Sequence, residues 1–441
     1  MRFYLLLVLA CMGTYTTYGQ KNILINNVEI FNGKDEATIK GNVLIVDNLI
    51  SKVSTTPIPV NRRADTQIIE GQGKFLMPGL IDAHVHLLME SIPQQVAMSS
   101  DVAYINLFAV KSAENQLMRG FTSVRDLGGA SISLKKAIDQ GLVKGPRVYP
   151  SGATISQTGG HGDFGMPTDV PRQIGGPMGY LEQTGMTSVA DGADQVLMRT
   201  RENLRQGATQ IKLMAGGGVA SDYDPLDVTQ YTEAEFRAAV EAAENWGTYV
   251  TVHAYTPKAV QSAVKAGVKC VEHGQLIDEE TAQILAEKGI WLCLQPFLDD
   301  EDAIPFKEGS ENRKKQLQMV AGTENAYNYA KKHGVKVAFG TDALFDAKLA
   351  SRQGAQLAKL SKWYSPYEVL KMATSTNAEL LRMSGPRNPY PNALGVIEEG
   401  AYADLILVDG NPIRNLDLIA NPGEKFLLIM KDGEIYKNKL N

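Results

Sequence analysis

The strongest constraint on the fold is an alternation of short apolar segments with helical patterns, which runs from about residue 78 to residue 345. The apolar segments are "GLIDAHVHL", "GFTSVRDLG", "GPRVYPSGA", "GATQIKLMAGG", "GTYVTVHAY", "GVKCVEHGQ", "GIWLCLQP" and "GVKVAFGTDA". Most begin with a Gly that can end the preceding helix, as in "ENWG" and "KKHG". Such alternation predicts parallel strands joined by crossover helices.

Eight units of this kind favour an α/β fold, a (β/α)8 TIM-like barrel over residues 78–384, with reactive groups at the carboxyl ends of the strands. A doubly wound open sheet is the alternative, but "AGGGVAS" matches neither nucleotide-binding spacing. Residues 21–77 and 385–441 contain alternating patterns typical of strands, as in "NILINNVEIFNG" and "FLLIMKDGEIYKN". We therefore expect a small β-sandwich domain built from both chain ends.

The first 20 residues differ from the rest of the chain. Arg2 is followed by an apolar run over residues 5–10 and by small and polar residues ending in "TYGQ", which is typical of a secretory signal peptide. Cys11, preceded by "VLA", offers lipidation as an alternative processing site. We expect an exported protein, periplasmic or secreted, with a lipid anchor at Cys11 in the alternative case.

Composition excludes several partners. Hydrophobic residues make up 44% and charged residues 21%, which is ordinary for a globular protein and predicts no membrane span. The net charge is -5 and the basic residues are scattered, so nucleic acid is not an expected partner. Beyond the N-terminus only Cys270 and Cys293 remain, too few for a disulfide framework, and we expect two buried free thiols.

Four of the six histidines fall in the predicted strands. His84 and His86 are one residue apart in "DAHVHL", and a strand places them on the same face, where two imidazoles can bind one ion. A single buried His is more often a hydrogen-bonded core residue than a metal ligand. Two on one strand shift the balance toward a ligand pair.

Other polar residues end the later strands. Lys212 ends the fourth, His253 the fifth, His273 the sixth and Asp342 the eighth. Taken singly, Lys212 could be a surface amine, the imidazoles could be core residues, and Asp342 could cap a helix. Together they indicate a site for zinc or a similar divalent ion, because imidazole and carboxylate are its preferred ligands.

The remaining two histidines are interpreted differently. His333, in "YAKKHG", precedes a helix-ending Gly, where a cation interacts favourably with the helix dipole. His161 lies in the Gly-rich "SQTGGHGDFG" after the third strand, and loops at that face of a barrel shape the pocket. We therefore expect His161 to contact the substrate.

With "PGLIDAHVH", Lys212, "TVHAY", "VEHG" and "FGTDA" in this order, the chain resembles the amidohydrolase superfamily, in particular its two-metal members with a carboxylated lysine. The resemblance implies that His84, His86 and Asp342 hold one metal and that the other histidines of the strands, His253 and His273, hold the second. It also implies two divalent ions, with zinc as the default, an N6-carboxylysine at position 212 that bridges them, and a metal-bridging hydroxide as the nucleophile. Asp342 would transfer the proton to the leaving nitrogen.

Within the superfamily, "SQTGGHGD" and "TVHAYTPKAV" are similar to the prolidase-like group, which contains Xaa-Arg dipeptidases and ochratoxin-type amide hydrolases. This resemblance implies a small-molecule substrate, a dipeptide or an N-acyl amino acid with a free carboxylate. By the same resemblance His161 and Tyr255 would contact the substrate carbonyl or carboxylate, although Tyr255 could equally be a packed tyrosine. Arg125 could bind a carboxylate or form a structural ion pair. We also expect a homo-oligomer.

Two loops should set the side-chain preference, one over residues 156–190 and one in "FLDDEDAIPFKEGSENRKKQ". The acidic run of Asp299, Asp300, Glu301 and Asp302 could select basic substrates, but a charge run is more often a solvated face. Two other functions stay open. The first is hydrolysis of a cyclic amide, as in imidazolonepropionase-like proteins, although the lysine counts against their mononuclear members. The second is a non-catalytic amidohydrolase-like scaffold, which should have lost ligands.

Overall fold

The chain is described by a computed structural model that covers residues 21–60, 66–173 and 175–440. The predicted signal peptide and Cys11 lie outside these described residues. Within them, no helix combines the length and the apolar character that crossing a membrane requires.

All eight predicted central strands are present. They are β6 (Leu80–Val85), β7 (Phe121–Asp126), β8 (Arg147–Pro150), β11 (Ile211–Met214), β12 (Val250–Ala254), β13 (Cys270–His273), β14 (Trp291–Leu294) and β15 (Val337–Phe339). Every pairing between neighbours among them is parallel. The predicted α/β class is confirmed.

These strands are paired in two sheets, β6-β7-β8 and a longer one that contains β11 to β15. Backbone hydrogen bonds connect the two sheets on both sides. The amide of Thr209 donates to the carbonyl of Pro150, at 2.8 Å, and the amide of Asp342 donates to the carbonyl of His84, at 2.9 Å. The end of the last strand therefore lies beside the end of the first.

The loop over residues 156–190 is not structureless. Two short strands, β9 (Thr154–Ser156) and β10 (Thr187–Val189), begin and end it and pair with each other, and β9 also pairs with β11. Within the loop, Arg172 forms ion pairs with Asp163 and Glu182. The sequence did not reveal these strands because each has only three residues, too few to show the alternating hydrophobic pattern of a strand.

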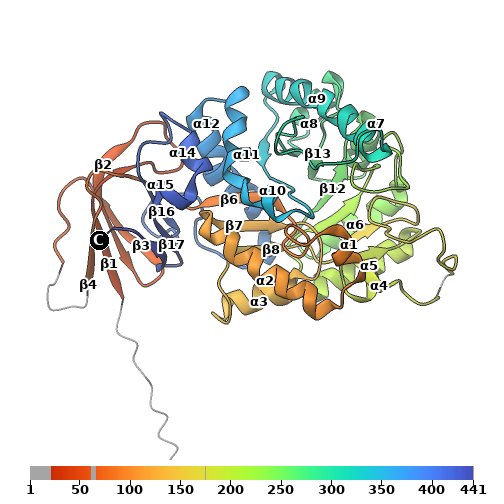
Figure 1. Cartoon of the computed structure of the whole chain (residues 1–441), viewed down its shortest axis with the longest axis horizontal. Coiled ribbons are helices and arrows are strands. Elements are labelled where there is room, and N and C mark those ends of the chain that lie inside the picture. Colours follow the sequence, from red (N-terminus) through yellow and green to blue (C-terminus); the bar gives the residue numbers. More distant parts are fainter. Residues whose placement is uncertain (1–20, 61–65, 174, 441) are drawn as a thin grey trace, which may run out of the picture.

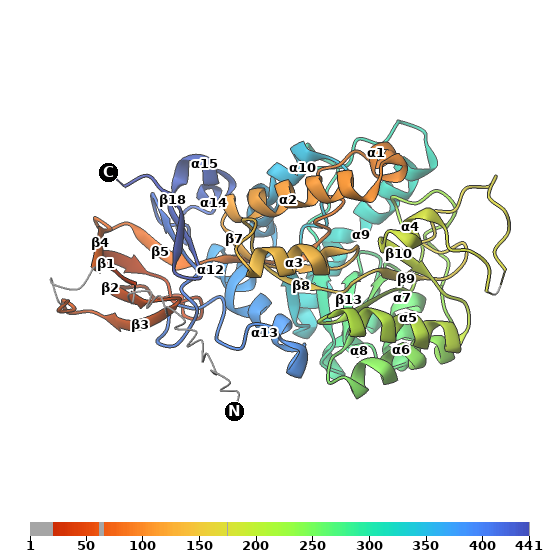
Figure 2. The ribbon, with the colours of Figure 1, turned by 90° about the horizontal axis from the view of Figure 1, so that it is seen from below.

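Helices connect the central strands and pack around them, as Figures 1 and 2 show. Those between β6 and β11 are α1 (Gln94–Ser99), α2 (Val102–Met118), α3 (Ser131–Asp139), α4 (Tyr180–Gln183) and α5 (Ala193–Gln206). Those between β11 and β15 are α6 (Glu233–Asn245), α7 (Pro257–Lys265), α8 (Glu279–Glu287) and α9 (Glu311–His333). The helix α9 ends at Gly334 in the left-handed conformation, with φ 68°, as "KKHG" predicts.

After β15 the chain is mainly helical until it returns to the N-terminal sheet. The segments are α10 (Ala347–Ser351), α11 (Gln353–Lys359), a 3-10 turn (Leu360–Lys362), α12 (Pro366–Lys371), a π-helical turn (Met372–Thr376), α13 (Asn377–Arg382) and a 3-10 turn (Gly385–Arg387). Two more short helices, α14 (Asp417–Ala420) and α15 (Pro422–Lys425), lie further on, between two strands of that sheet. Side chains from these helices and from the central strands share one large apolar core. Cys270 and Cys293 are buried and free, as predicted.

Both chain ends form one mixed sheet at the side of the molecule, where Figure 1 places the red and blue strands together. Its strands are β1 (Asn22–Ile30), β2 (Ile39–Val46), β3 (Leu49–Ser54), β4 (Thr66–Glu70), β5 (Phe75–Pro78), β16 (Leu405–Val408), β17 (Phe426–Lys431) and β18 (Glu434–Asn438). Since β5 pairs with both β1 and β16, strand pairing is continuous across the two ends. Side chains from β1 to β3 share one core with side chains from β16 and β17. The arrangement as a sandwich and the exact domain boundaries remain predictions.

Candidate metal centre and active site

Six side chains at the carboxyl ends of the central strands form what we call the ligand cluster. They are His84, His86, Lys212, His253, His273 and Asp342. Five come from the last residues of a strand or from the residues just after it, whereas Lys212, expected at a strand end, is the second residue of β11. Parallel strands place their carboxyl ends at the same edge. All are buried or nearly so. The fold thus brings together residues spread over more than half of the chain.

Three of these residues meet at one point. The Nε2 atoms of His84 and His86 lie 3.3 Å apart, and Asp342 Oδ1 lies 3.3 Å from each of them. One nitrogen or oxygen from each residue therefore converges on a common centre, as the ligands of a metal ion do.

The other two imidazoles lie beside this centre. The ring of His273 lies 5.0 Å from the ring of His84 and 4.5 Å from that of His253, between centroids. His273 Nδ1 is 2.8 Å from Gln295 Oε1, which leaves Nε2 as the nitrogen for a ligand. Lys212 lies on β11, opposite Thr251 of the neighbouring strand β12, and is buried.

Two observations test whether this cluster fits a metal. The carboxylate atom Asp342 Oδ1 is buried and has no hydrogen-bond partner among the described residues, although it faces two imidazoles. His273 and Asp342 also have φ angles of 78° and 49°, a left-handed conformation that is uncommon outside Gly. An oxygen without a partner and strained backbone at two ligand positions are what a metal site would explain.

The protonation states agree with metal binding. Burial lowers the pKa of His84 to about 4 and lowers those of His253 and His273 well below their usual value. Burial raises the pKa of Asp342, but the neighbouring imidazoles of His84 and His86 outweigh it and hold this pKa below its ordinary range. Burial also lowers the pKa of Lys212. The imidazoles of His84, His253 and His273 are therefore neutral and the carboxylate of Asp342 is charged, the forms that bind a metal ion.

Glu272 is a supporting residue that the sequence did not reveal. Its Oε1 accepts a hydrogen bond from Arg125 Nη2, at 2.7 Å, and its Oε2 lies 2.9 Å from His84 Nδ1. A carboxylate on the far nitrogen of a ligand imidazole fixes the orientation of the ring. Arg125 is fully buried, so of its two open interpretations the structure supports the ion pair, with Glu272 as the acid.

His161 and Tyr255 both border the ligand cluster. The ring of His161 stacks on that of His253, with 4.1 Å between centroids, and its Nδ1 lies 2.7 Å from Ser221 Oγ. A Cβ on Gly218 would lie 1.9 Å from the His161 ring, so this approach requires glycine. Tyr255 is nearly buried, and its ring lies 5.0 Å from that of His253.

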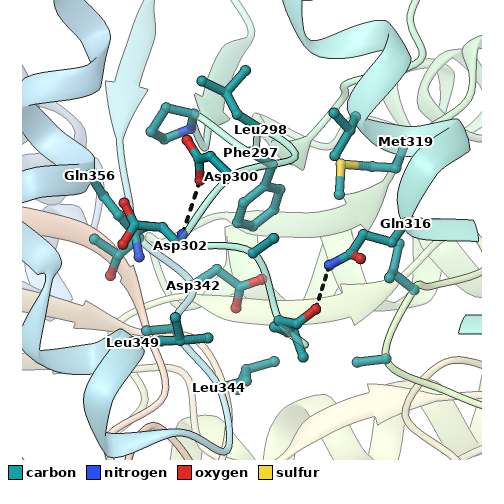
Figure 3. Close-up of a pocket in the computed structure, with 18 of the residues that line it drawn as sticks. Phe297, Leu298, Asp300, Asp302, Gln316, Met319, Asp342, Leu344, Leu349 and Gln356 are labelled. Carbon is teal, nitrogen blue, oxygen red and sulfur yellow. Dashed lines mark hydrogen bonds between the residues drawn. The ribbon is translucent and has the colours of Figure 1, made fainter. Parts of the chain in front are cut away.

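A cavity extends from the ligand cluster toward the loop after β14 (Figure 3). Its lining includes His161, His253, Tyr255 and Asp342. Apolar side chains form most of the remaining wall. A concave, mainly apolar site with a few polar groups at one end is typical of small-molecule binding.

The acidic run beside this cavity is only partly a solvated face. The side chains of Asp299 and Glu301 are 47% and 70% exposed, as that interpretation expects. For Asp302 the interpretation is wrong, since its side chain is only 4% exposed and lines the cavity together with Asp300. The cause is tertiary, because cations from α11 and the residue before it reach the run from 50 or more residues away.

The chain matches the model of the amidohydrolase family over residues 75–437. Ochratoxinase from Aspergillus niger is 31% identical over 422 residues, which cover 92% of this chain and 84% of the relative. A crystal structure of a prolidase complexed with N-methylphosphonate-L-proline is 33% identical with a TM-score of 0.86. A Xaa-Pro dipeptidase with bound methionine in the active site is 29% identical with a TM-score of 0.81. In both cases the match covers 95% of this chain and 100% of the solved chain.

The family match covers most of the chain and includes every member of the ligand cluster. The relatives align over nearly the full length, and the fold and the convergence of imidazoles with a carboxylate agree with the resemblance inferred from the sequence. The chain belongs to the amidohydrolase family and is related to ochratoxinase and to prolidase-like dipeptidases.

Proposed function

We propose that this amidohydrolase cleaves the amide bond of dipeptides or N-acyl amino acids that carry a free carboxylate. The observation that carries the proposal is the convergence of His84, His86 and Asp342 at one end of a concave, mainly apolar cavity. The relatives with names that refer to dipeptides, and the proline-based and methionine ligands in their structures, support this substrate class.

In this proposal the ligand cluster holds two divalent ions, with zinc as the default. His84, His86 and Asp342 would hold one ion and His253 and His273 the other, and Lys212, converted to a carbamate, would supply a further anionic ligand. Burial favours the neutral amine of Lys212, the form that reacts with carbon dioxide. When bound, two such ions polarise a carbonyl and lower the pKa of water toward neutrality.

The protein's own groups perform the remaining steps. Asp342 lines the cavity and faces the imidazoles, so it is placed to move a proton to the leaving nitrogen, which is a poor leaving group unless protonated. His161 and Tyr255 lie at the same end of the cavity and can donate hydrogen bonds to the substrate carbonyl or carboxylate. We also infer that the eight strands form one closed barrel, because hydrogen bonds connect both junctions between the two sheets.

The test is a screen of purified, metal-analysed protein against dipeptides, N-acyl amino acids and cyclic amides. We expect two metal equivalents and cleavage of the first two classes. Cleavage of cyclic amides alone would replace the proposed substrate class. Less than one metal equivalent in the active protein would contradict the two-ion site.

The carbamate has a test of its own. Protein incubated with ¹³C-bicarbonate should show a carbamate carbon by NMR, and a Lys212→Met variant should not.

Export from the cell is proposed separately, on the sequence of residues 1–20. Cell fractionation with N-terminal sequencing tests it, and radiolabelled lipid at Cys11 would identify the lipoprotein alternative.

A further inference from the structure

The cavity has an apolar wall beyond the ligand cluster. It is formed by Phe297, Leu298, Ile304, Met319, Val320 and Leu349. Figure 3 shows Phe297, Leu298 and Met319 on one side of this space and Asp342 on another. The ring of Phe297 lies parallel to that of His273, with 6.4 Å between centroids, so the wall begins directly beside the ligand cluster. A substrate bound at the cluster therefore places one of its groups against this wall.

Two carboxylates interrupt the wall, and each already has a cation. Lys359 Nζ lies 2.7 Å from Asp300 and also contacts Asp302. Arg352 contacts both carboxylate oxygens of Asp302. These four residues, which we call the paired rim, contain two negative and two positive charges. Glu301 also contacts Arg352, but its side chain is exposed and does not line the cavity.

The paired rim leaves no uncompensated negative charge for a basic substrate. At this wall, a lysine or arginine side chain would have to displace Lys359 from Asp300 or lie without a carboxylate partner. Burying a charge without a partner is costly. A large apolar group faces no such cost and gains from leaving water.

We propose that the cavity wall accepts a large uncharged group of the substrate, and that Lys359 is the specificity-determining residue that prevents selection of a basic one. This inference rests on the proposed function, because it assigns the side-chain preference of that same site. The acidic run thus acts as a neutralised part of the wall and does not bind a cationic substrate.

The first experiment compares kcat/KM for two dipeptide series, Xaa-Gly and Gly-Xaa, with Phe, Leu, Lys, Arg or Glu as the varied residue. Calorimetric binding of the free amino acids Phe, Leu, Lys and Arg to the same metal-loaded protein provides a second readout. At the position that faces the wall, Phe and Leu should exceed Lys and Arg by about tenfold or more, the range of discrimination that side-chain pockets reach. A preference for Lys or Arg, or no preference in either readout, would overturn the inference.

The two readouts separate this inference from the proposed function. If no dipeptide is cleaved but Phe and Leu still bind better than Lys and Arg, the proposed function fails and the side-chain preference stands. If dipeptides are cleaved with Arg or Lys preferred, the function stands and the side-chain preference fails.

Variants test Lys359 directly. Lys359→Met leaves Asp300 and part of the charge of Asp302 without a partner, so the ratio of Lys to Leu substrates in kcat/KM should rise about tenfold. Lys362→Met makes the same change at an exposed residue outside the cavity and should leave the ratio unchanged. An unchanged ratio in a folded, metal-loaded Lys359→Met protein would show that Lys359 does not determine the side-chain preference.

A second variant covers the case in which Lys359→Met does not fold. Asp300 is partly exposed, so Asp300→Asn should be tolerated, and it leaves an excess of positive charge at the paired rim. The ratio of Glu to Leu substrates should then rise. A shift toward Lys substrates would contradict the charge balance on which the proposal rests.

Discussion

Two charged clusters, each built around buried side chains, differ in whether their polar atoms are paired with one another. Arg147, on β8, forms ion pairs with Asp404 and Asp432 of the end sheet, at 3.2 and 2.7 Å, and lies over the ring of Tyr402 at 3.8 Å. The ligand cluster instead crowds imidazoles around a carboxylate oxygen that has no hydrogen bond among the described residues.

The first cluster contributes to the stability of the fold, whereas the second indicates a binding site. A buried charge with partners on all sides joins two parts of the fold and needs nothing more. Buried polar atoms that face each other without bonding are costly by themselves, so they indicate a ligand that the protein binds. The predictions below change one group at a time, from the largest expected effect to the smallest.

Asp342→Asn should have the largest effect on turnover. The amide can remain beside the imidazoles but cannot accept and deliver a proton, so kcat should fall by roughly 10² to 10⁴. Steady-state kinetics and metal analysis of the same sample measure this. Turnover near that of the wild type, with metal retained, would refute the proton-transfer role.

Arg147→Met and Lys212→Met should give opposite results. Without Arg147, the buried Asp404 has lost its cation, and the free energy of unfolding should fall by about 3–5 kcal/mol with little change in turnover per folded molecule. Lys212→Met removes a buried amine, so metal-free protein should be no less stable while metal content falls. Chemical denaturation and metal analysis of both variants decide this. A strongly destabilised Lys212→Met protein would make Lys212 a structural residue.

Glu272→Gln should weaken metal binding without removing a ligand. The amide is a poorer acceptor for His84 Nδ1, and the loss of such a supporting carboxylate typically costs about 10 to 100-fold in affinity. Competition with a chelator measures the affinity. Glu279→Gln, on the surface at the start of α8, is the matched control and should behave as the wild type.

Tyr255→Phe should have the smallest effect. It removes one hydrogen-bond donor and keeps the ring against His253, so KM should rise by up to about tenfold with kcat less affected. Kinetics with one dipeptide suffice. A variant identical to the wild type would leave Tyr255 as a packed tyrosine, the interpretation that the sequence left open.

The central strands were predictable because their signal is local. A run of β-branched residues after a helix-ending Gly is encoded within ten residues, and all eight predicted segments contain a strand. The strands β9 and β10 and the continuous pairing through β5 were not predictable. They depend on partners far away in the chain, such as Leu76 opposite Leu407.

The candidate site divides in the same way. His84 and His86 were predictable because strand geometry alone places them on one face, and His253, His273 and Asp342 because each lies near the end of a strand. Glu272 was missed because the sequence around a single acidic residue in an apolar strand does not indicate which distant residues it pairs with. Arg125 is 147 residues away and His84 is 188 residues away.

By itself the sequence determined the α/β alternation, the ends of the helices and the residue types that can bind metal, since each follows from backbone preference or side-chain chemistry within a few positions. Only the tertiary structure decided which acids are neutralised, which charges are left for a ligand and which side chains line the cavity. The reason is that the free energy of a charge depends on its surroundings, and in this chain the surroundings of Asp302, Glu272 and Asp342 come from distant segments.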